Sequence, residues 1–136
     1  MSEDEATSLV HERVEALGNR TGAAYAVVDP EDSLLGSASL LSIDWHRSAG
    51  VVAYWLAPES RGKGIGTSAV TMLCQWAFEA LGLARLELRV DVRNEPSQRL
   101  AERVGFRREG LLRSSEEIHG ARIDQYLYSL LPTDPI

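Results

Sequence analysis

The sequence predicts a single domain of the α/β or α+β type, in which helices pack on a mixed, mostly antiparallel sheet. The chain has 136 residues, of which 44% are hydrophobic and 25% charged, and this is the size and composition of one ordinary globular domain. Its apolar segments follow the order β-β-β-α-β-α-β-β. No linker, internal repeat or low-complexity stretch interrupts that order. We therefore expect residues 1–136 to form one domain.

The first half of the chain is expected to form one helix and three strands. Ser2 and Glu5 match a capping box, apolar residues follow at helical spacing, and Gly18 ends the pattern. Short apolar runs then predict strands over residues 23–28, 34–43 and 50–56, connected by turns at 29–32 and 44–48.

The second half is expected to begin with the longest helix. Apolar residues recur at helical spacing over residues 67–81, and Gly82 ends the helix. Alternation of apolar and charged residues predicts a half-buried strand over 86–91. A short helix over 94–104 and two strands over 106–112 and 123–130 complete the domain, with a hairpin loop at 114–120.

Composition excludes several classes of protein. No apolar run approaches the roughly 20 residues that span a bilayer, and the acidic start over residues 1–5 does not match a secretory signal. A single cysteine, Cys74, cannot form an internal disulfide, and three histidines give no zinc framework. Only one of the 14 basic residues is lysine, an arginine bias typical of GC-rich bacterial genomes. We expect a cytoplasmic bacterial protein without a metal and without a membrane partner.

The two halves of the chain differ in charge. Residues 1–60 carry 3 basic and 10 acidic residues, a balance of −7, and residues 61–136 carry 11 basic and 10 acidic residues, a balance of +1. A net charge of −6 disfavours nucleic-acid binding, which depends on neutralising phosphates. The second half is still basic enough to hold one small polyanion.

A glycine-rich loop connects the third strand to the longest helix. This arrangement binds phosphate, because glycines let the backbone approach the anion and the N–H groups of the first helical turn point at it. The loop does not match the Walker pattern, because Ala57 and Gly64 stand at two of its required positions. It does not match the dinucleotide pattern either, since Thr67 replaces the third glycine. An ordinary surface turn and a simple nucleotide-binding loop are the alternatives.

The remaining pattern, R-x-x-G-x-G over residues 61–66, resembles that of the GNAT superfamily of acyl-CoA N-acyltransferases. The resemblance is greater to the branch that contains the ribosomal-protein-alanine N-acetyltransferases. Residues 53–58 (AYWLAP) are similar to its strand before the loop, and residues 94–106 match N-x-x-S followed by A-E-x-x-G-F. Residues 124–130 are similar to its closing strand. The similarity covers about residues 23–131 and has three motifs in the right order.

The resemblance implies a sheet that is splayed in its middle and an acetyl-CoA site at the splay. The backbone of two strand residues and the loop would hold the pantetheine arm and the pyrophosphate, Asn94 would bind the pantetheine arm, and Ser97 would lie near the sulfur. Arg99 or Arg103 would reach the outer phosphates, unless they are ordinary solvated arginines. The implied acetyl-CoA residues are Leu56, Ala57, Arg61, Gly62, Lys63, Gly64, Ile65, Gly66, Thr67, Asn94 and Ser97.

The implied reaction is direct attack of an amine on the thioester. Ser97 would protonate the leaving thiolate, although a serine at a helix start can also be a plain capping residue. A distorted strand end near Leu56 would supply the backbone N–H for the oxyanion. Members of the branch often place a glutamate three residues before the Tyr-Trp pair, and here Val51 stands there. No base is therefore assigned, and the turn residues that could serve are Asp44, His46, Glu116, Glu117 and His119.

The sequence thus indicates an acetyl-CoA-dependent N-acetyltransferase acting on a primary amine, either a protein N-terminus or a small-molecule amine. The alternative is a catalytically weak acyl-CoA-binding module with a sensory or regulatory role. Family members usually begin with a further strand and helix, which the front of this sequence does not match. We expect an exposed edge strand in consequence, for which a homodimer or a longer natural start is the explanation.

Overall fold

A computed structural model describes residues 22–28 and 34–135 of the chain. The helix expected over residues 2–18 and the turn expected at 29–32 lie outside the described residues. Within the described residues, no helix is long and apolar enough to cross a membrane.

In the part of the chain that the structure describes, six strands form one mixed sheet in the order β1-β2-β3-β4-β6-β5. All neighbouring pairs are antiparallel except β3 and β4, which are parallel. The predicted mixed, mostly antiparallel sheet is therefore confirmed. The strands are β1 (Ala23–Val28), β2 (Leu34–Asp44), β3 (Ala49–Leu56), β4 (Arg85–Asp91), β5 (Arg107–Ile118) and β6 (Ala121–Leu130).

The described helices are a short 3₁₀ turn, η1 (Pro58–Ser60), and two α-helices, α2 (Ile65–Leu81) and α3 (Glu95–Val104). Helix α2 begins two residues before the predicted start, because Gly64 occupies the N-cap in a left-handed conformation. Gly82 ends α2 in the same conformation, as its sequence position predicted.

The core lies between α2, α3 and one face of the sheet. Strand β4 shows the division of faces most clearly: Leu86, Leu88 and Val90 are buried in the core, and the charged residues between them lie on the opposite face. Cys74 of α2 is fully buried in the same core, and burial raises the pKa of its thiol to about 12. Cys74 is therefore a core residue, and its buried, protonated thiol is unreactive.

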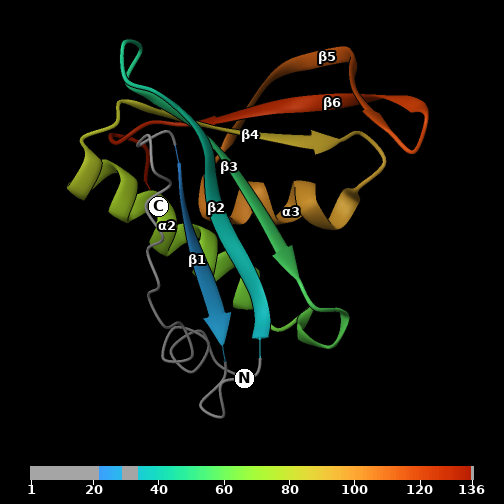
Figure 1. Ribbon diagram of the computed structural model, residues 1–136, viewed down its shortest axis with the longest axis horizontal. Helices are drawn as coiled ribbons and strands as arrows, with labels where there is room; N and C mark the ends of the chain where they lie inside the picture. Colours follow the sequence, from blue (N-terminus) through green and yellow to red (C-terminus); the bar gives the residue numbers. More distant parts are fainter. Residues whose placement is uncertain (1–21, 29–33, 136) are drawn as a thin grey trace.

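The middle of the sheet opens into a splay. Strands β3 and β4 pair only from Ala49 with Arg85 to Val52 with Leu88. Beyond that point β3 stays paired with β2 as far as Leu56, and β4 stays paired with β6 as far as Asp91. Each strand thus follows its own half of the sheet, and Figure 1 shows the two halves diverging.

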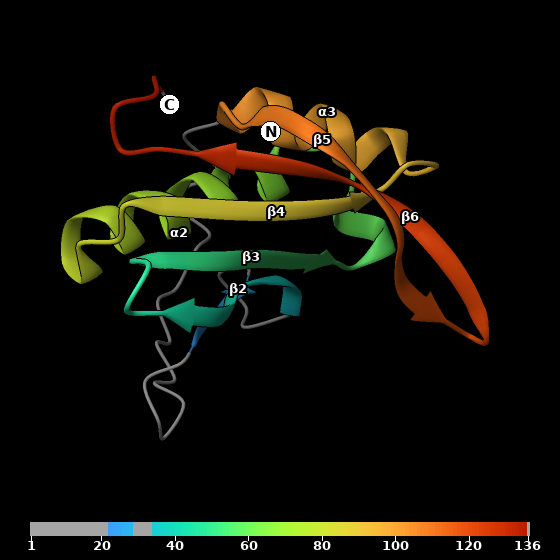
Figure 2. The same cartoon turned by 90° about the horizontal axis from the view of Figure 1, so that it is seen from above.

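Strands β5 and β6 form an arm that reaches beyond the other strands (Figure 2). The hairpin loop predicted at 114–120 is wrong, since β5 continues to Ile118 and only two residues form the turn. His119 and Gly120 have φ values of 51° and 80°, as a tight two-residue hairpin turn requires. Most side chains of β5 are exposed, so the segment lacks the apolar alternation by which a strand is predicted from sequence.

Candidate active site

The splay contains a cleft of about 700 Å³. It is bounded by the end of β3, the glycine-rich loop, the end of β4 and the start of α3. The lining residues are Val52, Ala53, Tyr54, Trp55, Leu56, Arg61, Gly62, Gly64, Gly66, Thr67, Leu88, Arg89, Val90, Asp91, Asn94, Pro96, Ser97, Arg99, Leu100 and Arg103.

The glycine-rich loop forms one end of the cleft. Gly62 and Gly64 both have φ near +77°, which glycine adopts at little cost, and a Cβ atom at either residue would meet nothing within 4 Å. Within this described loop, no N–H group from Gly62 to Thr67 donates a hydrogen bond. The first turn of α2 carries no acidic residue. The loop therefore presents free N–H groups and an open backbone, the combination that binds phosphate.

Close packing fixes the position of this loop. A Cβ atom on Gly66 would lie 2.8 Å from side-chain carbons of both Leu56 and Leu100. Only glycine therefore lets the start of α2 approach the end of β3 and the helix α3 so closely. Arg61 reaches back along the loop, and its Nε donates to the carbonyl oxygen of Leu56 at 3.3 Å.

Some of the residues expected to hold the cofactor lie outside the cleft. Ala57 is buried beside it, and its backbone N–H donates to the carbonyl oxygen of Leu35 at 2.8 Å, so that group is already engaged. Ile65 points its side chain into the core, and Lys63 is exposed on the loop without lining the cleft. The other expected cofactor residues line the cleft together, and so do Arg99 and Arg103.

Asn94, Ser97 and Tyr54 form the other end of the cleft. Asn94 is the N-cap of α3, and its Oδ1 accepts from the backbone N–H of Ser97 at 3.1 Å. The Ser97 side chain is therefore free of the capping role that its position allowed. Its hydroxyl instead accepts a hydrogen bond of 2.7 Å from the phenol of Tyr54, on β3. Ser97 is buried, Tyr54 is partly buried, and both line the cleft.

Tyr54 is a residue of this site to which the sequence alone assigned no role. Burial raises the pKa of its phenol, while the hydrogen bond to Ser97 and the charge of Arg61 act in the opposite direction. The phenol thus stays protonated at neutral pH and can donate to Ser97. Residues 52, 54 and 56 lie on the same face of β3 because side chains alternate along a strand, and this face is the one covered by the helices. This alternation was the signal in the sequence that could have placed Tyr54 near α3.

The end of β3 is regular, contrary to the distorted strand end that we expected. Trp55 and Leu56 pair in register with Ser37 and Gly36, and the irregularity falls instead on β2, between Leu40 and Ser42. The N–H of Ala57 points toward β2. Since successive N–H groups of a strand point to opposite sides, that of Leu56 points toward the splay.

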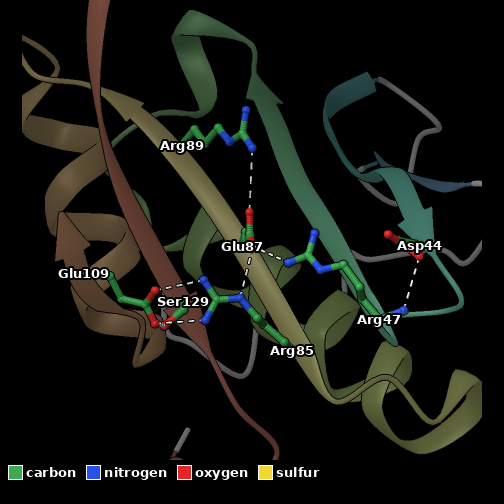
Figure 3. Close-up of polar contacts among 7 residues, drawn as sticks. All are labelled: Asp44, Arg47, Arg85, Glu87, Arg89, Glu109 and Ser129. Carbon is green, nitrogen blue, oxygen red and sulfur yellow. Dashed lines mark hydrogen bonds and ion pairs between the residues drawn. The ribbon is translucent and has the colours of Figure 1, made fainter. Parts of the chain in front are cut away.

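A buried carboxylate lies next to Val51, where the sequence offered no base. Glu87 is the cross-strand partner of Val51, on the sheet face opposite the helices. Its Oε2 is 3.0 Å from Nε of Arg85 and 3.6 Å from Nη2 of Arg47, and its Oε1 is 3.7 Å from Nη2 of Arg89 (Figure 3). Both oxygens of the Glu87 carboxylate are thus engaged by arginines, and Glu87 is not among the residues that line the cleft.

The turn residues considered as bases do not line the cleft. His46 is exposed in the turn between β2 and β3, and His119 is exposed at the tip of the β5–β6 arm. The Oδ1 atom of Asp44 accepts the backbone N–H groups of His46 and Arg47. Glu116 and Glu117 are exposed on the arm. Among the described residues there is also no group of His, Cys, Asp or Glu that could hold a metal ion.

Diverging central strands, with a glycine-rich loop at one end of the cleft and a hydrogen-bonded hydroxyl pair at the other, are features of an acetyltransferase domain. The chain belongs to the GNAT acetyltransferase family, because the model of the Acetyltransferase (GNAT) domain matches residues 1–107.

The chain is similar to several acetyltransferases. It is 35% identical over 105 residues to the "Uncharacterized N-acetyltransferase p20" of Bacillus licheniformis, covering 77% of this chain and 59% of that protein. It is 33% identical over 97 residues to the spermidine N(1)-acetyltransferase of Vibrio cholerae, covering 71% and 56%. The ribosomal-protein-S5-alanine acetyltransferase of Vibrio fischeri matches with a TM-score of 0.80 at 32% identity, over 85% of this chain and 64% of that one. The chain thus spans less than two thirds of these relatives.

Proposed function

We propose that this protein is an acetyl-CoA-dependent N-acetyltransferase that transfers the acetyl group to a primary amine. One observation supports this most strongly: a single cleft joins the free N–H groups of the loop to the Tyr54–Ser97 hydroxyl pair. The first end suits a pyrophosphate and the second suits a leaving thiolate.

The described residues fit acetyl-CoA by their chemistry. The N–H groups of residues 62–67 and the positive end of α2 would hold the pyrophosphate. Arg99 and Arg103, which make no ion pair with any described residue, would meet the outer phosphates. Oδ1 of Asn94 is engaged by Ser97, so its amide N–H₂ group is the part available to the pantetheine arm. When bound, acetyl-CoA supplies the activated thioester carbonyl.

The residues at the inner end of the cleft would assist the transfer. The Leu56 N–H, which points toward the splay, would donate to the carbonyl oxygen as negative charge develops on it. Ser97 would give its hydroxyl proton to the departing thiolate. Because Tyr54 already donates to Ser97 Oγ, its phenol proton would then replace the one that Ser97 gives away. The proton that the amine loses as the amide forms would pass through water and restore the phenol.

We assign no general base among the described residues of the cleft. Asp91 is the one described carboxylate that lines it, and its hydrogen bonds with Arg93 lower the pKa of Asp91 to about 2. Such a carboxylate stays ionised and is a weak proton acceptor. The acceptor amine would therefore have to arrive in its neutral form.

A panel of primary amines assayed for free CoA release, with CoA affinity measured in parallel, tests this function. We expect release that depends on both the amine and acetyl-CoA. CoA binding without transfer to any amine would contradict the enzyme and support the alternative, an acyl-CoA-binding module. Absence of CoA binding would contradict both.

A further inference from the structure

Two hollows on the molecule share one arginine. The first is the cleft in the splay. The second is a shallow depression, largely open to solvent, with a volume of about 720 Å³ beside the β5–β6 arm, and Arg89 lines both. The residues lining the second hollow are Arg89, Leu111, Leu112, Arg113, Ser114, Ser115 and Asp124. An acceptor in the second hollow would thus lie beside the splay.

Arg89 stands where the splay begins. It directly follows Leu88, the last residue of β4 that pairs with β3. Because Leu88 and Val90 are buried in the core, the side chain of Arg89 projects from the opposite sheet face. That side chain is 47% exposed, so the guanidinium can be reached from solvent.

The carboxylate that anchors Arg89 does not neutralise it fully. Glu87 is closest to Arg85, and its contacts to Arg47 and Arg89 are both longer than 3.5 Å. Arg85 also forms two hydrogen bonds of 2.9 Å with Glu109. Three guanidiniums therefore share two carboxylates in this cluster, and Figure 3 shows Arg89 at its outer end.

The second hollow adds another positive group. Arg113 forms no ion pair with any described residue. Among the described residues of the lining, Asp124 is the only acidic one, and its Oδ1 already accepts the backbone N–H of Ser114 at 2.7 Å. The arginines on the loop and α3 line only the cleft and are available to the phosphates of CoA, whereas Arg113 lines only the second hollow and Arg89 lies between the two.

From this distribution of charge we infer that the acceptor is an amine that also carries an anionic group, a carboxylate or a phosphate. Arg89 and Arg113 bind that group in the second hollow, while the amine faces the splay. Guanidiniums bind both anions with paired, charge-assisted hydrogen bonds. A linear polyamine is disfavoured there, because it would place its ammonium groups beside two guanidiniums. This inference rests on the proposed transferase function for the step at the splay.

Matched acceptors test the inference. Glycylglycine and glycylglycinamide differ in one carboxylate, and glucosamine 6-phosphate and glucosamine differ in one phosphate. Each is titrated into the 136-residue chain with and without CoA, and each is assayed with acetyl-CoA. We expect the anionic member of at least one pair to bind about tenfold or more tightly than its neutral partner, and to have the higher kcat/KM. The pair that shows the difference identifies the anion.

Variants assign the effect to the site. Arg89→Met and Arg113→Met keep the length of the side chain and remove its charge, so each should abolish most of the preference. Arg107→Met is the matched control, since Arg107 lies on β5, is exposed and pairs with Asp134 away from both hollows. It should preserve the preference. The midpoint of urea unfolding of each variant should equal that of the unmodified protein, which shows that the fold is intact, and the CoA affinity of Arg113→Met and Arg107→Met should be unchanged because neither residue lines the cleft.

The outcomes separate this inference from the proposed function. Transfer to anionic and neutral amines at equal kcat/KM overturns the inference and leaves the transferase standing. Selective, arginine-dependent binding of an anionic amine without transfer supports the inference and overturns the transferase. If Arg89→Met and Arg113→Met keep the preference for anionic amines, the anion does not bind in the second hollow. Failure of every anionic amine to bind also overturns the inference.

Discussion

The phenol of Tyr54 donates a hydrogen bond of 2.7 Å to Oγ of Ser97, joining the end of β3 to the first turn of α3. These two elements border the splay, so the hydroxyl pair lies at the place that our proposed function assigns to the thioester. The Ser97 proton is left free to point into the cleft. The phenol keeps its own proton, because burial raises its pKa.

This pair predicts a non-additive kinetic defect. Ser97→Ala should lower kcat by about 100-fold, the range for loss of a proton donor, with little change in CoA affinity. Tyr54→Phe should give a smaller fall in kcat, since Ser97 could still give up its own proton. The double variant should be little worse than Ser97→Ala alone, because both groups act through one proton path.

The free energy of unfolding of each variant is the control for this double-mutant cycle. Ser97→Ala keeps the backbone N–H that Asn94 caps, so the free energy of unfolding should fall by no more than about 1 kcal/mol. If kcat is unchanged while stability falls, Ser97 is a structural residue. Additive kinetic losses would show that the two hydroxyls act independently.

Local patterns in the sequence predicted most of the fold. The apolar runs at β1 to β3, the alternation along β4 and the glycines that end α2 and α3 are all local features, and the elements lie where these features placed them. The β5–β6 arm was mispredicted because its side chains are mostly exposed, so no apolar face marks the strand. The start of α2 was misplaced by two residues because a left-handed Gly64 can cap a helix without any side-chain signal.

The site was less accessible to sequence reasoning than the fold. The loop could be predicted because its residues are contiguous. Tyr54 and Ser97 are 43 residues apart, and only the register of β3 against α3 brings their hydroxyls together. The proximity of Glu87 to Val51 likewise depends on a parallel pairing between β3 and β4 that no local pattern specifies.

A second prediction concerns the charge of the loop. Gly64→Asp should weaken CoA binding strongly, whereas Gly64→Asn should weaken it much less. Both side chains tolerate the left-handed conformation of residue 64 and project into open space, so the two variants differ only in charge. Isothermal titration with CoA measures the difference. If the two folded variants bind CoA with equal affinity, the phosphates of CoA do not bind at the N-terminus of α2.

A third prediction concerns acid stability. The pair with Arg85, assisted by Ser129, holds the pKa of Glu109 at about 2, below its ordinary value of 4.5. A lowered pKa stabilises the fold above the ordinary value, and that contribution is lost as the pH falls toward 2. Glu109→Gln should therefore lower the free energy of unfolding at pH 7, by no more than about 1 kcal/mol because the pair is partly exposed. Urea unfolding should show the difference shrinking by pH 3. A difference that is constant between these pH values would contradict the ion pair.

The fourth prediction follows from the absence of an assigned base. The rate should rise with pH and level off near the pKa of the acceptor amine, about 7.7–8.0 for a peptide N-terminus and about 10.4 for a lysine-like amine. His46→Ala and His119→Ala should leave the limiting rate unchanged, since neither histidine lines the cleft. If either variant loses a step in the pH–rate profile near pH 6.5, the substituted histidine is the base.

Mass spectrometry of the acceptor after incubation with acetyl-CoA tests the central claim most directly. The protein should produce an N-acetylated amine in step with free CoA, and Ser97→Ala should slow both equally while still binding CoA. If CoA binds but no amine in a broad panel becomes acetylated, the protein is not an N-acetyltransferase and the cleft serves binding alone.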